Sequence, residues 1–175
     1  MLKKHRISEF EEEIESKMVK MTRLAWIGYL QKFYWNWHIN LSFGNTVSAN
    51  YAEKLLKRWV EKLKIEERLQ VAGIALVQTK SPENVHIHAL LISKDTPFNG
   101  SLNMVDKYKW EREWPHGKCV ISTSVECAPA IFAKYIAKEK NMSLKSPDDY
   151  HLITIKPNLL NKLQNALSGR ISSEN

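Results

Sequence analysis

Apolar and polar positions change their spacing along the chain, and each spacing predicts a helix or a strand. Over residues 8–30, apolar residues recur every three or four positions behind an acidic start, which predicts a helix. Over 33–44, apolar and polar residues alternate, which predicts a half-buried strand. Helical spacing returns over 49–69. This part of the chain therefore predicts the order helix, strand, helix.

The next part predicts a hairpin followed by shorter elements. Apolar runs over 71–79 and 85–93 flank a turn rich in polar residues, which indicates two paired strands. After the hairpin we expect a helix over 102–112, a strand over 118–125, a helix over 128–141, a strand over 151–155 and a helix over 157–168.

The order of these elements predicts the fold class. A strand that is joined through a helix to a second strand, with a hairpin next, is typical of an α+β sandwich of the split β-α-β kind. We expect residues 1–34 to form an N-terminal helical extension and residues 146–175 a C-terminal extension that packs on the central domain or trails it.

Composition narrows the possible partners. The 175 residues include 26 Lys and Arg against 19 Asp and Glu, a net charge of +7 that favours a polyanion such as nucleic acid or an anionic membrane surface. No apolar run has the length of a membrane span, and the N-terminus lacks an apolar signal core, so we expect a cytoplasmic protein. Cys119 and Cys127 form no metal-type pair and no disulfide framework.

His86-Ile87-His88 is the sharpest chemical feature. Residues two apart on a strand point to the same face, so both imidazoles can meet one metal ion. The alternative is that both histidines lie on a solvated face of the sheet.

Tyr135 and Lys138 are the second feature. Three residues apart on the predicted helix over 128–141, they lie on one helix face. A tyrosine hydroxyl that acts as a nucleophile needs a nearby cation or metal to favour the phenolate, and Lys138 could supply part of that charge. Alternatively, Tyr135 belongs to an apolar stripe with Phe132 and Ile136.

These features resemble the motifs of a known family. The apolar strand over 37–43, the His86–His88 motif and the Tyr135-x-x-Lys138 motif follow one another in the order of the three motifs of rolling-circle replication initiators of the HUH endonuclease superfamily. The stretch over 114–121 is also similar to that family. The resemblance covers residues 35–141 and indicates the type with a single tyrosine.

The resemblance implies an antiparallel sheet of about five strands with flanking helices, formed by a domain over 35–145. It implies a metal-dependent enzyme that nicks and joins single-stranded DNA at the replication origin of a plasmid or virus. A helicase and a polymerase of the host or replicon would be its partners, and the protein would act in the host cell if it is viral. Alternatives are a transposase or relaxase of the same superfamily, or a basic module that binds nucleic acid without cutting it.

The resemblance also assigns roles to residues. Tyr135 would attack the scissile phosphate and form a 5′-phosphotyrosyl intermediate, with Lys138 beside it. Mg²⁺ or Mn²⁺ would lie on His86, His88 and a third polar side chain. Many relatives carry a glutamate on the strand before the histidine pair, where this chain has Gln78, and Glu83 in the turn is the second choice.

Single-stranded DNA also needs stacking surfaces and cations. The alternative for each candidate is an ordinary core tryptophan or a solvated lysine. The candidates for stacking on bases are Trp35, Trp37, Trp110 and Trp114, and those for contacting phosphates are Lys80, Lys94, Lys134 and Lys140.

Overall fold

The computed structural model describes most of the chain between residues 17 and 160. The described residues are 17, 19–79, 85–93, 101–126, 128–143, 150–156 and 158–160.

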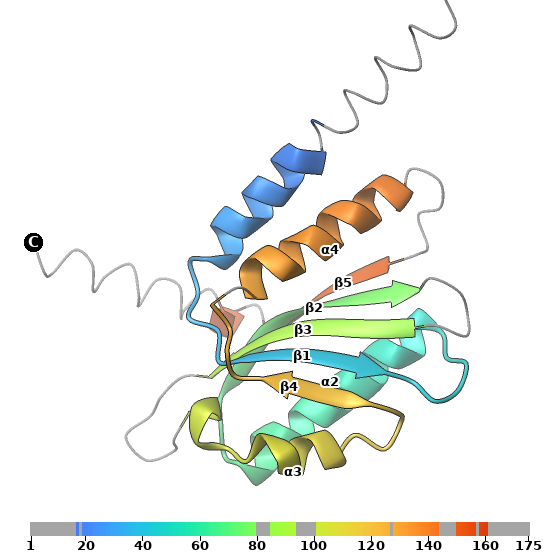
Figure 1. The fold of residues 1–175 in the computed structure, drawn as a ribbon. Helices are drawn as coiled ribbons and strands as arrows, with labels where there is room; N and C mark the ends of the chain where they lie inside the picture. Colours follow the sequence, from blue (N-terminus) through green and yellow to red (C-terminus); the bar gives the residue numbers. More distant parts are fainter. Residues whose placement is uncertain are drawn as a thin grey trace, which may run out of the picture.

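The strands of the described residues form one five-stranded sheet in the order β4-β1-β3-β2-β5, with helices on both of its faces (Figure 1). Every pair of neighbouring strands is antiparallel, so the predicted α+β fold with a five-stranded antiparallel sheet is confirmed. The strands are β1 (Trp37–Ser42), β2 (Val71–Thr79), β3 (Val85–Ser93), β4 (Cys119–Ser122) and β5 (Tyr150–Ile155).

The strands β1 and β2 form the predicted split β-α-β unit. Both pair antiparallel with β3, so they run parallel to each other with β3 between them. The helix α2 (Ala49–Glu66) connects them, and it begins where the Ser48 side chain accepts a hydrogen bond from the backbone N–H of Tyr51 at 3.3 Å. The strand β5 comes from the segment that we described as a C-terminal extension, and it pairs with β2 at the edge of the sheet.

Several predicted boundaries change. The strand predicted over 33–44 is shorter, because Trp35 does not continue the alternation of β1. Its indole N–H donates to the carbonyl oxygen of Leu30 at 2.8 Å, and its ring packs with Phe33. The helix predicted over 102–112 is two elements, a 3₁₀ turn (Leu102–Met104) and α3 (Lys107–Arg112), since Asp106 caps a new helix through the N–H of Tyr108.

The remaining helices agree with the sequence pattern where they are described. The helix α4 (Ala128–Ser143) matches the prediction over 128–141 and extends it by two residues. Of the helix predicted over 8–30, residues 17 and 19–30 are described and are helical; of the one predicted over 157–168, residues 158–160 are described and are helical.

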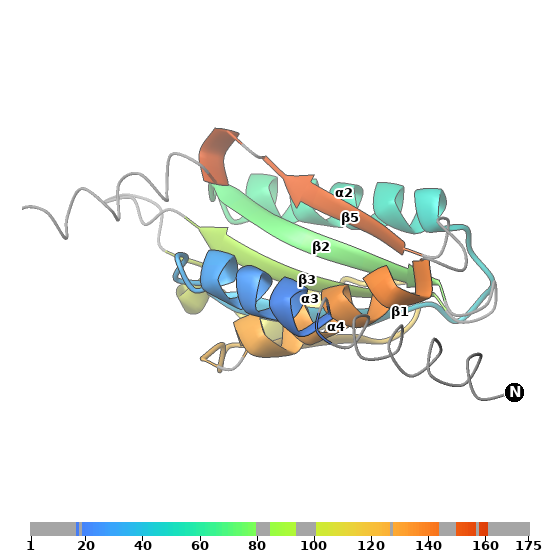
Figure 2. The same ribbon diagram turned by 90° about the horizontal axis from the view of Figure 1, so that it is seen from above.

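Each face of the sheet carries its own helices and its own apolar cluster (Figures 1 and 2). On the α2 face, Leu56 and Leu63 pack with Ile39 and Ile87. On the α4 face, the helix over 19–30 and α4 lie on the sheet together, and Phe132 packs with residues such as Leu76 and Leu90. Consecutive strand residues therefore enter different clusters, as a pleated strand requires.

The helix α3 lies along the outer edge of β4 and bonds to it. The backbone N–H of Ile121 donates to the Glu111 carboxylate at 2.7 Å, and the Lys107 ammonium donates to the Ile121 carbonyl oxygen at 3.1 Å. Glu67 at the end of α2 holds α3 in place by accepting from the Trp110 indole at 2.8 Å and from Lys109 at 2.7 Å.

Candidate metal centre

Strand alternation and register bring polar side chains together at one end of the α4 face. Gln78 on β2 lies opposite His86 on β3, and Asn40 on β1 lies opposite His88 on β3. These four residues are called the histidine–amide cluster here. The prediction that Gln78 lies across the hairpin from the histidine pair is confirmed by the register.

The His88 ring lies between two side-chain carbonyl oxygens. Its Nδ1 is 2.5 Å from Oδ1 of Asn40, and its Nε2 is 3.2 Å from Oε1 of Gln78. With the Asn40 amide oriented so that Oδ1 faces the ring, this oxygen accepts and Nδ1 carries the proton in the first contact. The second contact then needs a doubly protonated ring, a rotated Gln78 amide that donates its N–H, or a cation that both Nε2 and Oε1 bind.

The donor set fits a divalent cation. Ligands about 2.1 Å from an ion, as for Mg²⁺, subtend about 100° when they are 3.2 Å apart, close to the right angle of an octahedral site. His86 is on the same strand face, two residues before His88 and opposite Gln78. Two imidazoles and one amide oxygen are therefore the candidate ligands, with no carboxylate among them.

Burial gives the cluster a closed side and an open side. Gln78 is only 2% exposed, whereas His86, His88 and Asn40 are half-buried. Within the described residues, no group of three or more His, Cys, Asp or Glu side chains could hold a metal. The second-choice ligand, Glu83, lies outside the described residues.

The helix that carries Tyr135 and Lys138 lies on the same sheet face as the cluster. Phe132 and Ile136 of α4 are fully buried, in one apolar cluster with Leu76 and Leu90. In both ribbon views α4 runs toward the end of the sheet where β2 ends and β3 begins (Figures 1 and 2). Tyr135 and Lys138 lie in this helix, but their side chains are outside the described part.

Two polar residues of β1, Asn40 and His38, were not among the site residues predicted from the sequence. Both were visible only as polar positions in an alternating strand. His38 is 8% exposed, its Nε2 has no hydrogen-bond partner among the described residues, and burial lowers the pKa of its imidazole. It lies on the α4 face opposite Leu90, one row from Asn40 and His88.

The stacking role that we predicted for the tryptophans is wrong for this structure. Trp35, Trp37, Trp110 and Trp114 are all buried in the apolar clusters. The indoles of Trp110 and Trp114 also donate hydrogen bonds, to Glu67 and to the Ser42 carbonyl oxygen. Their apolar area stabilises the fold, because burial in a core is favoured over exposure on a surface.

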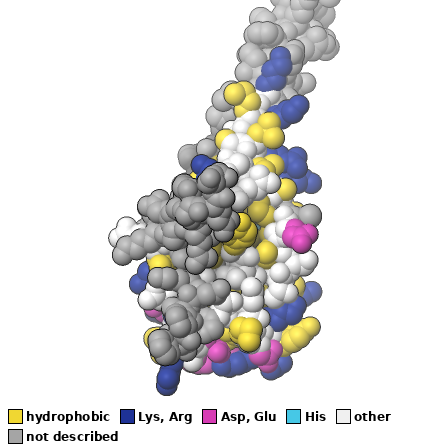
Figure 3. All heavy atoms as spheres, turned by 90° about the vertical axis from the view of Figure 1, so that its left-hand side faces the viewer, with side chains coloured by type: hydrophobic (Ala, Val, Ile, Leu, Met, Phe, Trp, Pro, Cys, Tyr) yellow, Lys and Arg dark blue, Asp and Glu magenta, His cyan; other side chains and the backbone are white. Residues whose placement is uncertain are grey.

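The predicted phosphate-contacting lysines are placed only in part. Lys134 is exposed on α4, whereas Lys80, Lys94 and the side chain of Lys140 lie outside the described part. Lys20 and Arg23 add exposed positive charge on the helix over 19–30, and Figure 3 shows basic side chains spaced along that part of the molecule.

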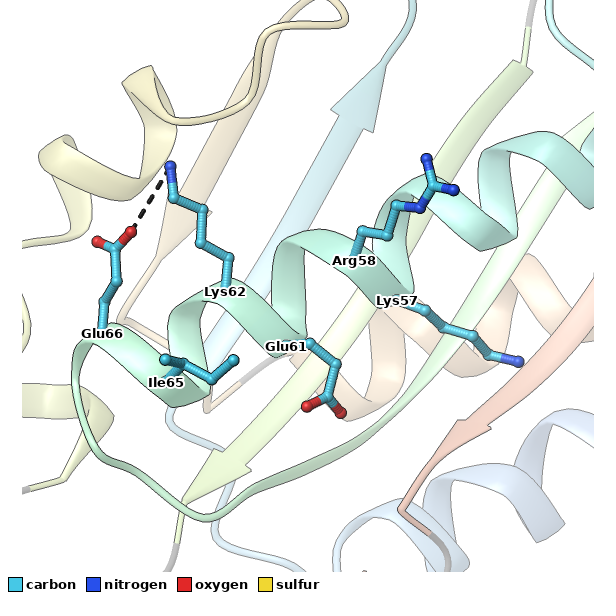
Figure 4. A pocket seen from close by; sticks show the side chains of 6 residues that line it. All are labelled: Lys57, Arg58, Glu61, Lys62, Ile65 and Glu66. Carbon is cyan, nitrogen blue, oxygen red and sulfur yellow. Dashed lines mark ion pairs between the residues drawn. The ribbon is translucent and has the colours of Figure 1, made fainter.

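A shallow hollow on the outer side of α2 contains none of the predicted site residues. The hollow is lined by three basic residues, two glutamates and Ile65, and an ion pair joins Lys62 to Glu66 at 3.6 Å (Figure 4).

Cys119 is buried, and burial raises the pKa of its thiol to about 12, so the thiolate is disfavoured. None of the described helices combines the length and apolar character needed to cross a membrane.

Comparison of the chain with protein-family models, with curated proteins and with solved structures found no match.

Proposed function

We propose that this chain is a metal-dependent endonuclease of the HUH type that nicks and rejoins single-stranded DNA at a replication origin. The observation that carries the proposal is the pairing of His88 Nε2 with Gln78 Oε1 at 3.2 Å, on the sheet face against which Phe132 and Ile136 of α4, the helix that includes Tyr135, pack. A metal-ligand pair and a tyrosine-bearing helix on one face are what the proposed chemistry requires.

The ligands in this proposal are His86, His88 and Gln78. A bound Mg²⁺ or Mn²⁺ would polarise the scissile phosphate and offset the negative charge that develops on it. The half-buried histidines leave room for a substrate oxygen on the open side of the cluster, and the buried Gln78 closes the other side.

The nucleophile in this proposal is Tyr135. Its phenolic oxygen attacks phosphorus, the bond from phosphorus to the 3′-oxygen breaks, and the phenolic proton is transferred to that leaving oxygen or to solvent. Lys138, three residues further along α4, favours the phenolate. The products are a 5′-phosphotyrosyl enzyme and a free 3′-hydroxyl, which can reverse the step and rejoin the strand.

The substrate and partners follow from the products and from the charge. A 3′-hydroxyl is the primer that a polymerase extends, so a helicase and a polymerase of the host or replicon would act after the nick. The net charge of +7 and the exposed Lys20, Arg23 and Lys134 favour a polyanionic strand.

The test is incubation with a pool of single-stranded oligonucleotides and Mn²⁺, followed by a denaturing gel. We expect a covalent protein–DNA band that is lost in Tyr135→Phe and retained in Tyr108→Phe, which changes an exposed tyrosine of α3. Lys138→Ala should slow the reaction without abolishing it, because the metal supplies most of the positive field.

A peptide map of the adduct decides between the tyrosines. Tyr150 is the strongest rival, since its position on β5 pairs with Gln78. Phosphotyrosine at Tyr150 would contradict the assignment of Tyr135.

The metal ligands are tested in the same assay. His86→Ala and His88→Ala should each lose Mn²⁺ binding and nicking together, whereas His116→Ala, in the loop after α3, should lose neither. Nicking at the parent rate by both cluster variants would contradict the metal site.

A second candidate is a basic module that binds nucleic acid without cutting it, which the net charge of +7 also favours. Tight binding of single-stranded DNA with no cleavage in Mn²⁺ on any oligonucleotide of the pool would select this candidate.

A further inference from the structure

We infer that Asn40 is a positioning residue for His88. Its side-chain carbonyl holds the imidazole as the tautomer with its proton on Nδ1, and so turns the Nε2 lone pair toward Gln78. This inference rests on the proposed function, because it assigns Nε2 to a metal ion.

The position of Asn40 is fixed by the sheet. Its strand, β1, is paired on both sides, with β3 on one side and β4 on the other. Asn40 and His88 are direct partners in the β1–β3 register, and Oδ1 of Asn40 is 2.5 Å from Nδ1 of His88. Both residues are half-buried, so this hydrogen bond meets less competition from water than one on an open surface.

The chemistry of the contact selects one tautomer. A neutral imidazole carries a proton on one ring nitrogen and a lone pair on the other. Because the Asn40 oxygen only accepts, it stabilises the form with the proton on Nδ1, and the lone pair is then on Nε2. That nitrogen is the one that faces Gln78 Oε1 at 3.2 Å. Metal-binding histidines commonly have such a partner on the ring nitrogen that does not bind the metal, and the partner also raises the basicity of the ligand.

Without this partner, His88 would lose two constraints at once. The ring could take the tautomer with the proton on Nε2, which leaves no lone pair for an ion there. It could also rotate about its side-chain bonds, since the Asn40 oxygen would no longer hold Nδ1 toward β1. Loss of such a partner typically lowers metal affinity by about 10- to 100-fold.

The test compares three substitutions on the α4 face of β1. Asn40→Leu keeps a side chain of similar size but removes the hydrogen-bond acceptor for His88. Asn40→Asp keeps an acceptor oxygen at this position. Ser42→Ala is the matched control, because Ser42 lies on the same face two residues further along, opposite His86. Circular dichroism and thermal unfolding establish that each variant is folded.

Two measurements are made on each full-length chain. Nitrogen-15 NMR of the metal-free protein reports which ring nitrogen of His88 is protonated. Calorimetry with Mn²⁺ alone reports affinity. We expect Nδ1 to be protonated in the wild type and in Asn40→Asp, and this preference to be lost in Asn40→Leu. Mn²⁺ affinity should fall about 10- to 100-fold in Asn40→Leu, be equal or higher in Asn40→Asp, and change less than about twofold in Ser42→Ala.

The outcomes separate this inference from the proposed function. If the wild type binds Mn²⁺ and Asn40→Leu binds it equally well, the positioning role is overturned while the metal centre stands. If the wild type binds no Mn²⁺, the proposed function is overturned, and the tautomer alone then tests Asn40. A wild-type His88 with its proton on Nε2 overturns the inference in either case.

Discussion

The two faces of the sheet are formed by the same strands, yet their side chains differ in polarity. On the α2 face, the alternate residues of β1 and those of β3 from Val85 to Leu91, such as Trp37, Ile39 and Ile87, are apolar and buried, and only the last residue of β3, Ser93, is polar. On the α4 face, β3 is apolar at one end, with Leu90 and Ile92, and polar at the other, with His86 and His88. Along β3, the α2 face is therefore apolar up to its last residue, whereas the α4 face is polar over the first half of the strand and apolar over the second.

The difference indicates how this fold combines stability with a polar site. The α2 face and the apolar end of the α4 face bury the two hydrophobic clusters, and this burial stabilises the sheet. The histidine–amide cluster then lies on paired strands rather than on a loop, so its side chains begin from fixed backbone positions. Substitutions on the two faces should therefore separate stability from metal binding.

The largest expected effect on stability is in the α2 face. Leu56 is fully buried against the sheet, and Leu56→Ala should lower the free energy of unfolding by about 2–5 kcal/mol, because it removes buried methyl groups and leaves a cavity. Ile65→Ala on the same helix is the control: Ile65 is 74% exposed, and its loss should change stability by less than about 0.5 kcal/mol. Urea unfolding measures both, and equal losses would contradict the assignment of the core.

An intermediate effect, on Mn²⁺ affinity, is expected when Gln78 at the polar end of the α4 face is replaced by a charged residue. Gln78→Glu should tighten Mn²⁺ binding by about 1 kcal/mol or more, since a carboxylate is a stronger ligand than an amide. The metal-free variant should be less stable than the wild type at neutral pH, because the carboxylate is buried. Activity need not rise, since a more tightly held ion is a weaker Lewis acid.

Calorimetry with Mn²⁺ and thermal unfolding with and without the ion measure these two effects. Unchanged Mn²⁺ affinity in Gln78→Glu would point to Glu83, or to a residue outside the hairpin, as the third ligand.

The smallest expected effect is the contribution of His38 to the dependence of stability on pH. His38 lies on the α4 face between the apolar row at Leu90 and the polar row at His88. Its pKa is lowered from 6.5 by burial. As pH falls below about 6.5, the unfolded chain binds a proton that the folded chain does not, so stability falls until pH passes the lowered folded pKa. Its partners across the sheet on that face, Leu90 and Ser122, do not titrate.

His38→Leu removes the titrating group and keeps an apolar volume. It should flatten the dependence of unfolding free energy on pH between about 7 and 5, measured in urea. If the unfolding free energy of His38→Leu changes with pH as steeply as that of the wild type, titratable groups other than His38 cause the pH dependence.

Much of the fold could be predicted because its strongest signals are local. The strands β2 and β3 have the predicted bounds, since each is an apolar run between polar turn residues. The start of β1 could not be predicted, because Trp35 and Trp37 show the same alternation but pack in different clusters. Asn36 separates them: its N–H donates to Leu91, and its side chain accepts from the N–H of Ser93, contacts between distant parts of the chain.

The candidate site was predictable only within the hairpin. Gln78 and the histidines are close in sequence, so the turn that joins their strands already implies that they face one another. Asn40 is 48 residues from His88, and only the β1–β3 register brings it to the ring. The tryptophan prediction failed for the opposite reason: residue type favoured stacking on bases, whereas burial depends on the complete fold.

The contacts between α3 and the outer edge of β4 have a consequence for self-association. An unpaired edge strand offers its N–H and C=O groups to a strand of another molecule, which is a common route to aggregates. At Ile121 both groups are already bonded, to Glu111 and to Lys107. A second chain could extend the sheet at Ile121 only by displacing both side chains, so α3 opposes the addition of a strand at this position of β4.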